Sequence, residues 1–172
     1  MDGDQADLQK LTELKRKYDN VLLYVDEAHA FGVRGRQGLG CAEEFHCIHD
    51  IDFLVGTFGK AAASVGAYIV CKKVIREYLV NRMRTLIFTT GLPPVNIAWT
   101  LFIVRRLADM QERRKHLAHI SRTLREALQV RGYTCPSVSH IVPMIIGPSA
   151  DTVLQAEALQ RHGFSALPVR PP

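Results

Sequence analysis

The sequence predicts an α/β fold with a mostly parallel sheet, on the evidence of two apolar segments and of the residues that follow them. Residues 21–25 form an apolar run without alternation, which is typical of a strand that is covered on both faces. A second strand is expected at 51–56, and polar residues follow both segments. Because open α/β sheets bind their ligands at the carboxyl ends of strands, we expect the two strand ends to form one site.

The elements around these strands follow from local patterns. Apolar residues recur at helical spacing over 7–18, and basic residues near the end of that segment favour a helix. The segment 31–40 is rich in glycine, so we expect a loop whose backbone conformation matters more than side-chain volume; a plain mobile connection is the alternative. A strand at 66–71 follows its predecessor too closely for a helical crossover and is expected to pair with it in antiparallel fashion.

The second half of the chain is expected to be mainly helical. A helix is predicted over 73–83, and an irregular segment over 85–94 ends in two prolines that start the next helix. The region 95–131 carries two apolar stripes and forms one long helix or two, ended by Gly132. A small α/β unit is expected after it, with strand, helix and strand at 140–146, 152–162 and 164–169. No further element closes the sheet of that unit, so we expect the chain to be truncated.

Composition excludes several classes of protein. The chain is 47% hydrophobic and 23% charged, which is ordinary for a folded protein and unlike a disordered one. Its longest nearly apolar run, 97–104, is far shorter than the roughly 20 residues of a membrane helix. The acidic N-terminus lacks the pattern of a signal peptide, so we expect a cytoplasmic protein without a membrane partner.

The cysteines and the basic residues indicate neither a metal nor a nucleic acid. The four cysteines lack C-x-x-C spacing and are expected to be reduced thiols. The loose group around Cys47 lacks the second half of a Cys/His ligand pattern, so we assign no metal. The net charge of +5 arises mainly at 82–84, 105–106 and 113–115. No aromatic residues alternate with these clusters, which favours a solvated helix face or the surroundings of an anionic substrate over a nucleic-acid partner.

The position of Lys60 is more difficult to explain by a purely structural role than that of Asp26. It lies in the turn after the second strand, between Gly59 and small alanines that leave room for a ligand. A desolvated lysine amine is a nucleophile for carbonyls and forms Schiff bases. Pyridoxal phosphate requires such a lysine, and it requires a carboxylate that keeps the pyridine nitrogen protonated. Lys60 and Asp26 meet these two requirements, although an aspartate at a strand end is also a common cap.

Two further side chains near the strand ends fit the same cofactor. Thr57, three residues before Lys60, could offer its hydroxyl to the phosphate, and His29 could form a hydrogen bond with the ring oxygen. The pattern Asp-x-x-His is a weak signal alone, but it is more specific together with the lysine turn after a second buried strand. We therefore predict one cofactor site from Asp26, His29, Thr57 and Lys60.

An alternative interpretation from a different class is a helicase motor. Residues 21–29 also fit a hydrophobic strand that ends in Asp-Glu-Ala-His, where the aspartate would hold Mg²⁺ and the glutamate would activate water. That class requires the phosphate-binding pattern G-x-x-x-x-G-K-[ST]. Around Lys60, Leu54 stands at the position of the first glycine and Ala61 at that of the hydroxyl residue. The pattern fails twice, so we favour the pyridoxal-phosphate interpretation.

At these residues the chain resembles the α-oxoamine synthase family of fold-type I pyridoxal-phosphate enzymes. Residues 26–32 look like the family's D-[DE]-A-H-[GA]-x-G, residues 57–61 like its lysine segment, and residues 88–94 like the segment before its interdomain helix. The resemblance runs through the whole chain. It implies half of a large domain, in which helices cover both faces of the sheet, then an interdomain helix region and part of a small C-terminal α/β domain. These would occupy 1–94, 95–131 and 132–172.

The resemblance also implies a role for each site residue. Lys60 would bind the cofactor as a Schiff base and later act as the base that removes the α-proton of the substrate. Asp26 would contact the pyridine nitrogen, His29 the ring oxygen and Thr57 the phosphate. In a homodimer, a hydroxyl from the segment before the interdomain helix would reach the phosphate in the partner subunit; this residue is Thr90, with Thr89 as the less favoured alternative.

The reaction implied by the resemblance is a decarboxylative condensation of an amino acid with an acyl thioester. Residues 169–172 favour the branch of the family that acts in biotin biosynthesis, with L-alanine and pimeloyl-CoA or a pimeloyl carrier protein as substrates. Another branch, such as glycine C-acetyltransferase, is the alternative within the family.

The chain departs from the family pattern in two respects. After the lysine the family usually has a bulkier residue and a glycine, whereas this chain has Ala62, Ala63 and Ser64, so the conformation of this turn is not predicted. The upstream residues that stack on the cofactor and bind its phosphate have no counterpart here, and the arginine that binds the substrate carboxylate lies further downstream in the family. We therefore expect this chain alone to be inactive.

Overall fold

The computed structural model describes residues 2–170 of the 172-residue chain. These residues form two compact units, Ala6–Leu117 and a second one made of residues 2–5 and 118–170. Among the residues described, no helix is both long and apolar enough to cross a membrane. The four cysteines are thiols.

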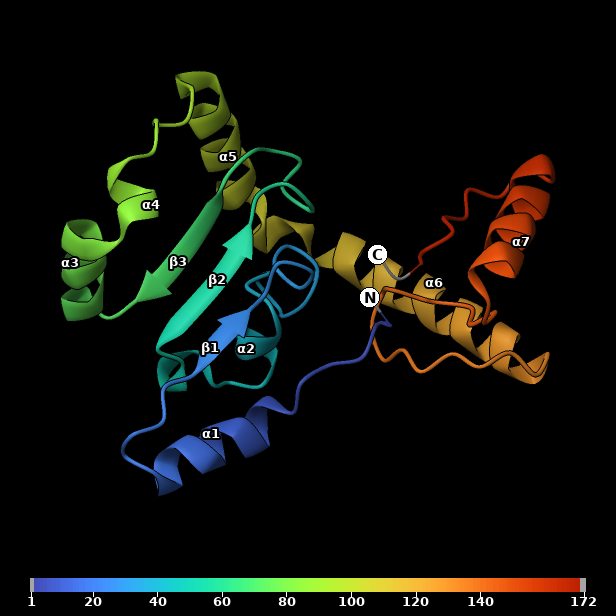
Figure 1. The fold of residues 1–172 in the computed structure, drawn as a ribbon, viewed down its shortest axis with the longest axis horizontal. Coiled ribbons are helices and arrows are strands. Elements are labelled where there is room, and N and C mark those ends of the chain that lie inside the picture. Colours follow the sequence, from blue (N-terminus) through green and yellow to red (C-terminus); the bar gives the residue numbers. More distant parts are fainter. Residues whose placement is uncertain (1, 171–172) are drawn as a thin grey trace. The chain divides into compact units, whose positions relative to one another are not determined.

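A three-stranded sheet is the centre of the first unit (Figure 1). Its order is β1 (Tyr24–Asp26), β2 (Phe53–Thr57) and β3 (Ala67–Cys71), with β1 and β2 parallel and β2 and β3 antiparallel. The parallel pair and the antiparallel third strand were both predicted. β1 is shorter than predicted and begins at Tyr24, although Leu23 already contacts the next strand through its carbonyl, which accepts hydrogen bonds from Asp52 N and Phe53 N.

Two helices of this unit lie where their sequences predict. In α1 (Leu8–Lys17) the side chain of Asp7 caps the first turn by accepting a hydrogen bond from Lys10 N at 3.0 Å, and three basic residues lie in the last turn. α3 (Lys73–Arg82) was also predicted. The segment expected to be irregular, 85–94, is so only in part, because the short helix α4 (Arg84–Ile87) occupies its start.

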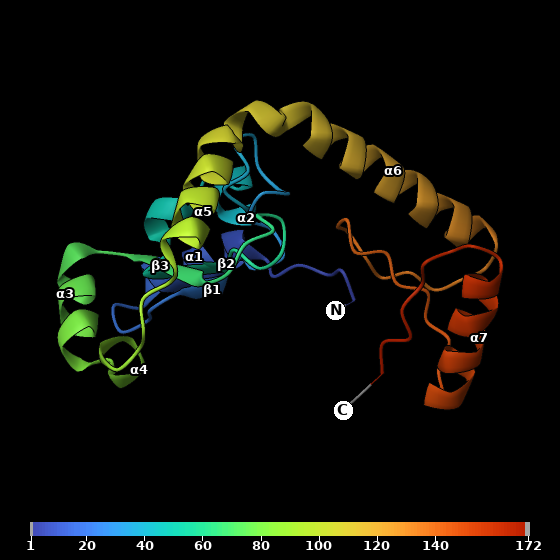
Figure 2. The same ribbon diagram turned by 90° about the horizontal axis from the view of Figure 1, so that it is seen from above.

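Two helices, rather than one, follow the proline pair. α5 (Pro94–Arg106) has Pro94 in its first turn, where the missing N–H of proline leaves no hydrogen bond unmade. The 3₁₀ turn Ala108–Met110 separates α5 from α6 (Gln111–Val130), both labelled in Figure 2. This outcome decides between the two alternatives left open by the sequence.

The second unit contains helix α7 (Ser149–Arg161), as predicted. Gly132, with φ +81°, follows the end of α6 and adopts the left-handed conformation expected of a helix stop. The strands expected at 140–146 and 164–169 were wrong, because neither segment forms a strand ladder within the part of the chain that the structure describes. An extended apolar segment is a strand only when a neighbour pairs with its backbone groups.

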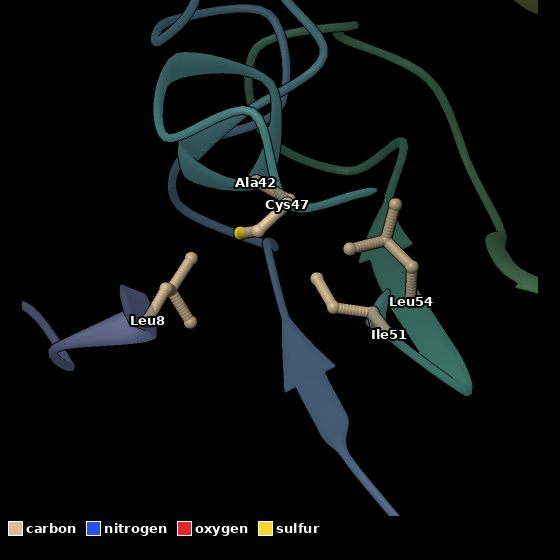
Figure 3. Packing of buried hydrophobic residues seen from close by; sticks show 5 residues of the cluster. All are labelled: Leu8, Ala42, Cys47, Ile51 and Leu54. Carbon is tan, nitrogen blue, oxygen red and sulfur yellow. The ribbon is translucent and has the colours of Figure 1, made fainter. Parts of the chain in front are cut away.

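One cluster of buried side chains joins the helices to the sheet (Figure 3). Its members come from α1, from α2 (Cys41–Glu44), from the segment before β2 and from β2 itself. Partly buried Val25 of β1 packs against it. The buried members are Leu8, Ala42, Cys47, Ile51 and Leu54.

A buried carboxylate also joins α1 to the start of β2. Asp52 is 4% exposed, and its Oδ2 accepts hydrogen bonds from Leu23 N at 2.9 Å and from Lys15 Nζ at 2.5 Å. Burial by itself would raise the pKa of Asp52, but the hydrogen bonds and the positive charge of Lys15 outweigh it, so the pKa lies below its ordinary value.

We expect Asp52→Asn to lower the free energy of unfolding by about 2 kcal/mol at pH 7, because a charge-assisted hydrogen bond to a buried acceptor is lost. A carboxylate with a lowered pKa in the folded state stabilises the protein above the unfolded-state pKa, and this contribution disappears as the pH falls through the folded-state pKa. The difference between wild type and variant should therefore shrink below about pH 4. Urea unfolding at pH 7 and at pH 3 measures both effects.

The control is Asp50→Asn, since the Asp50 carboxylate is paired with an exposed arginine, Arg16, at 2.9 Å. Its loss should cost less than about 1 kcal/mol at pH 7. Equal losses in the two variants would show that the buried pair of Lys15 and Asp52 stabilises the fold no more than the exposed pair of Arg16 and Asp50.

Candidate active site

The ends of β1 and β2 place two predicted site residues on one face of the sheet. Asp26 is the last residue of β1 and is paired in register with Val55 of β2. Thr57 lies two residues beyond Val55, and alternate residues of a strand point to the same face. Asp26 and Thr57 therefore share a face, and Lys60 follows in the turn after β2.

The two chain segments that leave these strands are in direct contact. The rings of Phe31 and Phe58 meet edge to face with 6.0 Å between their centres. Gly32 has φ +79°, and a Cβ at this position would lie only 2.8 Å from the Cβ of Ala61. Only glycine combines this backbone conformation with so close an approach. The segment that contains His29 is thus packed against the turn that contains Lys60.

His29 lies within the electrostatic range of both Lys60 and Asp26. Partial burial lowers the pKa of the His29 imidazole, the charge of Lys60 lowers it further, and the Asp26 carboxylate acts in the opposite direction. The side chains of His29 and Lys60 are both exposed. One oxygen of Asp26 accepts a hydrogen bond from Ala28 N at 2.7 Å, which fixes the start of the turn toward His29.

The hydroxyl of Thr57 holds the lysine turn in place. It donates to the carbonyl of Gly66 at 3.1 Å and accepts from Gly59 N at 3.1 Å. A hydroxyl has a single proton, so Thr57 can donate to a phosphate only if that proton leaves Gly66 O. Further hydrogen bonds close the turn, including one from Ala63 N to Lys60 O at 2.9 Å.

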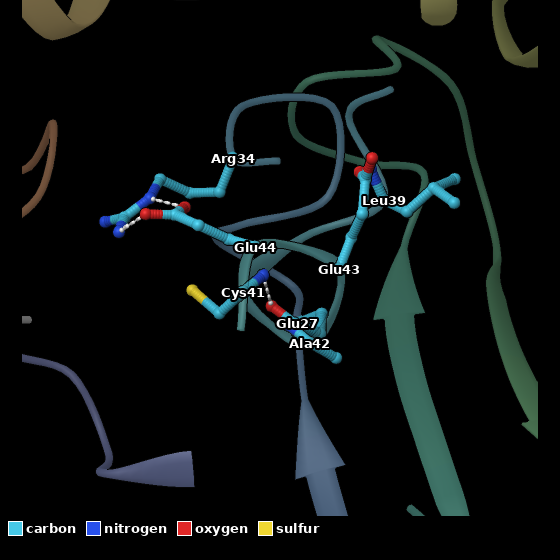
Figure 4. Close-up of polar contacts among 7 residues, drawn as sticks. All are labelled: Glu27, Arg34, Leu39, Cys41, Ala42, Glu43 and Glu44. Atoms are coloured by element: carbon cyan, nitrogen blue, oxygen red, sulfur yellow. Dashed lines mark hydrogen bonds and ion pairs between the residues drawn. The ribbon is translucent and has the colours of Figure 1, made fainter. Parts of the chain in front are cut away.

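The glycine-containing loop 31–40 is fixed by carboxylates (Figure 4). Glu27 is 2% exposed, and its carboxylate accepts hydrogen bonds from Ala42 N at 2.7 Å and from Cys41 N at 3.0 Å, at the start of α2. Glu43 accepts from Gln37 N and Leu39 N within the loop itself. These contacts favour the interpretation in which the backbone conformation of the loop matters.

Charge also shapes the surroundings of this loop. Arg34 and Glu44 form a bidentate pair with two contacts of 2.8 Å, and the hydrogen bonds from Arg34 lower the pKa of Glu44. Burial and the nearby Glu27 carboxylate raise the pKa of the Cys41 thiol to about 11, so this cysteine is a poor nucleophile at neutral pH.

Arg114, like Glu27, has a structural role at the loop 31–40, which differs from the role expected for its basic cluster. The basic cluster 113–115 was predicted to be a solvated face or the surroundings of an anionic substrate, but Arg114 is 8% exposed. Its guanidinium donates to the carbonyls of Leu107 at 2.6 Å and of Arg36 at 2.5 Å. Arg114 thus connects the loop to the turn between α5 and α6.

The structural roles of Glu27 and Arg114 were not predicted, and the sequence contains a usable signal only for Glu27. Because Glu27 directly follows Asp26 at the strand end, its side chain is expected on the opposite, interior side of the sheet. Arg114 has two basic neighbours in the sequence, and nothing local distinguishes it from them.

The structure does not bring Thr90 to the other predicted residues. It lies in the exposed segment between α4 and α5, and among the described residues its side chain has no hydrogen bond to the strand-end group. Its proposed contact with a partner subunit remains a prediction.

Comparison with known proteins identifies relatives along the whole chain. The family model described as aminotransferase class I and II matches residues 1–172. A curated protein of Glaesserella parasuis serovar 5 (strain SH0165), named "Putative 8-amino-7-oxononanoate synthase", is 57% identical over 173 residues, which cover 100% of this chain and 46% of that protein. The chain thus spans less than half the length of this relative.

Two solved structures share the fold. Serine palmitoyltransferase from Sphingomonas wittichii matches with a TM-score of 0.90 and 33% identity, over 100% of this chain and 44% of that one. A serine palmitoyltransferase variant from S. paucimobilis with a bound PLP–myriocin aldimine matches with a TM-score of 0.86 and 29% identity, over 95% of this chain and 43% of that one. The predicted fold class and family resemblance are confirmed, and the helicase alternative receives no support.

Glu27→Gln should lower the free energy of unfolding by about 1–3 kcal/mol. A glutamine has one acceptor oxygen, so its NH₂ group would face one of the two backbone N–H donors that Glu27 now satisfies. Urea unfolding measures this loss. Glu13→Gln, on the exposed side of α1, is the control and should change the value by less than about 0.5 kcal/mol.

The pKa of His29 should respond to its two charged neighbours in opposite directions. In the cofactor-free protein, Lys60→Met should raise the pKa, because a cation that disfavours the imidazolium is removed, and Asp26→Asn should lower it. NMR titration of the imidazole C–H signals measures both shifts. Lys73→Met, in exposed α3, should leave the titration unchanged; the same response to both lysine variants would contradict the proximity of Lys60 and His29.

Proposed function

Because the chain belongs to the aminotransferase class I and II family, we propose that the whole protein uses pyridoxal phosphate to condense L-alanine with a pimeloyl thioester. The products are 8-amino-7-oxononanoate, carbon dioxide and the free thiol. The observation that carries this proposal is the contact between the segment after β1 and the lysine turn after β2, which gathers Asp26, His29 and Lys60. The name of the 57% identical relative supports the choice of substrates.

The described side chains fit the cofactor. An exposed lysine amine, a carboxylate at the end of β1 and a hydroxyl at the end of β2 are the groups that its aldehyde, pyridine nitrogen and phosphate require. The close approach of Gly32 to Ala61 holds the segment after β1 against the lysine turn. When bound, the cofactor supplies an electron sink for the charge that develops on the α-carbon of the substrate.

Each residue has a separate task in this proposal. Lys60 Nζ would hold the cofactor covalently and would be the base that takes the α-proton of the substrate. The Asp26 carboxylate would accept a hydrogen bond from the pyridine nitrogen and would so keep the proton there. The lowered pKa of His29 favours its neutral imidazole, which would donate one N–H to the ring oxygen. Thr57 orients the turn, and its hydroxyl would donate to the phosphate if it gave up its hydrogen bond to Gly66 O.

We further propose that the whole protein is a cytoplasmic homodimer. Thr90, or Thr89, would donate its hydroxyl to the phosphate held by the partner subunit. The exposure of this segment ahead of α5 supports such a contact. Pimeloyl-CoA and a pimeloyl carrier protein are alternative acyl donors in this proposal.

A different synthase activity is the second candidate. The structural match to serine palmitoyltransferase favours a reaction of the same type with another amino acid and a longer acyl chain. Both reactions would use the same lysine and carboxylate, so the two candidates differ only in substrate. Product analysis with alanine, glycine and serine against pimeloyl, acetyl and palmitoyl thioesters distinguishes them.

In the whole protein, Lys60→Ala should abolish the visible absorption band of the bound cofactor and lower the rate of condensation by about 10²–10⁴-fold or more, since both the covalent attachment and the base are lost. Absorption spectra and turnover with alanine and pimeloyl-CoA measure these effects. Lys73→Ala removes an exposed lysine of α3 and should leave both unchanged.

Asp26→Asn should retain the cofactor and lose most of the activity.

An unchanged absorption band in the Lys60→Ala variant would exclude Lys60 as the attachment site. A preference for serine with palmitoyl thioester would keep the chemistry and replace the assigned substrates.

A further inference from the structure

The lysine turn contains an alanine in a conformation that alanine seldom adopts. Ala63 has φ +46°, which lies in the left-handed region. The Cβ of an L-residue crowds the backbone in this region, whereas glycine enters it freely. Ala63 also donates its N–H to the carbonyl of Lys60, so its conformation closes the turn that Lys60 begins. Some other contact must therefore hold Ala63 in place.

Helix α5 supplies that contact. The indole N–H of Trp99 donates to two consecutive carbonyls of the turn, those of Ala63 at 3.0 Å and Ala62 at 3.2 Å. The next residue of the helix, Thr100, forms a hydrogen bond of 2.7 Å with the hydroxyl of Ser64. Two adjacent residues of α5 thus bind three adjacent residues of the turn.

Packing fixes the two partners of this contact. Ala62 is fully buried in a cluster with Phe31 and Leu107, so its carbonyl has a fixed position. The indole ring of Trp99 stacks on Phe102, one helical turn further on, with 5.7 Å between the ring centres. The indole N–H has one hydrogen and no acceptor role, so a shared bond to two carbonyls uses it completely.

We propose that Trp99 is a positioning residue for Lys60: its hydrogen bonds hold Ala63 in the left-handed conformation and thereby set the direction of the lysine side chain. This proposal rests on the proposed function, in which Lys60 is the site of covalent attachment. Trp99 touches neither the cofactor nor the substrate in this scheme. It acts through the backbone of the turn.

The test is a double-mutant cycle in the whole protein. Trp99→Phe removes the N–H and keeps an aromatic ring for Phe102, while Ala63→Gly makes the left-handed conformation accessible without support. The readout is the rate at which the Lys60 amine of the cofactor-free protein is reductively methylated, followed by mass spectrometry. The exposed Lys73 in the same sample is the internal reference.

Trp99→Phe should change the ratio of Lys60 to Lys73 labelling by about three- to tenfold, which corresponds to the loss of one hydrogen bond. It should accelerate release of the cofactor by a similar factor. Ala63→Gly alone should have little effect, and in the double variant it should restore both quantities toward wild type. Ala61→Gly is the matched control, because Ala61 is not left-handed, and it should not rescue Trp99→Phe.

Additive effects of the two substitutions, or equal rescue by Ala61→Gly, would overturn the proposal. A general loss of stability with an unchanged labelling ratio would do so as well, since it would give Trp99 only a structural role. The labelling experiment needs no cofactor. Its failure is therefore distinguishable from the failure of the proposed function, which Lys60→Ala tests independently.

Discussion

The close approach of Gly32 to Ala61 is the constraint on which the rest of the site depends. Parallel pairing of β1 with β2 brings the two strand ends to one edge of the sheet, but it does not by itself bring the following turns together. That requires a residue without a side chain at Gly32 and small residues after Lys60. The edge-to-face contact of Phe31 with Phe58 then closes the arrangement over the sheet.

Two adjacent acidic residues divide the work at the end of β1. Asp26 lies on the exposed face with Thr57, where it can act on a ligand, and Glu27 is directed inward to the first N–H groups of α2. The strand geometry separates them, because successive side chains point to opposite faces. Thus one carboxylate is available for chemistry, and the other holds the loop that adjoins it.

Much of the site could be predicted from the sequence, because its main residues belong to local patterns. An apolar run that ends in Asp26, and a turn with Lys60 between small residues, are visible without knowledge of contacts. The supports could not be predicted in this way. Trp99 and Arg114 lie 36 and 78 residues away from the backbone groups that they bind, Ala63 and Arg36. The prediction of two strands in the second unit was wrong for a related reason, since a strand depends on its neighbour as well as on its own residues.

The strained alanine also has an evolutionary consequence. A glycine at position 63 would adopt the same conformation without support, and it would release position 99 from the need for an indole. The residues at these two positions are therefore not free to change independently. Across related sequences, an alanine or larger residue at 63 should occur with a hydrogen-bond donor at 99, and a glycine at 63 should permit many residues there. A substitution at position 63 of the lysine turn would then be accompanied by a substitution in α5, 36 residues further along the chain.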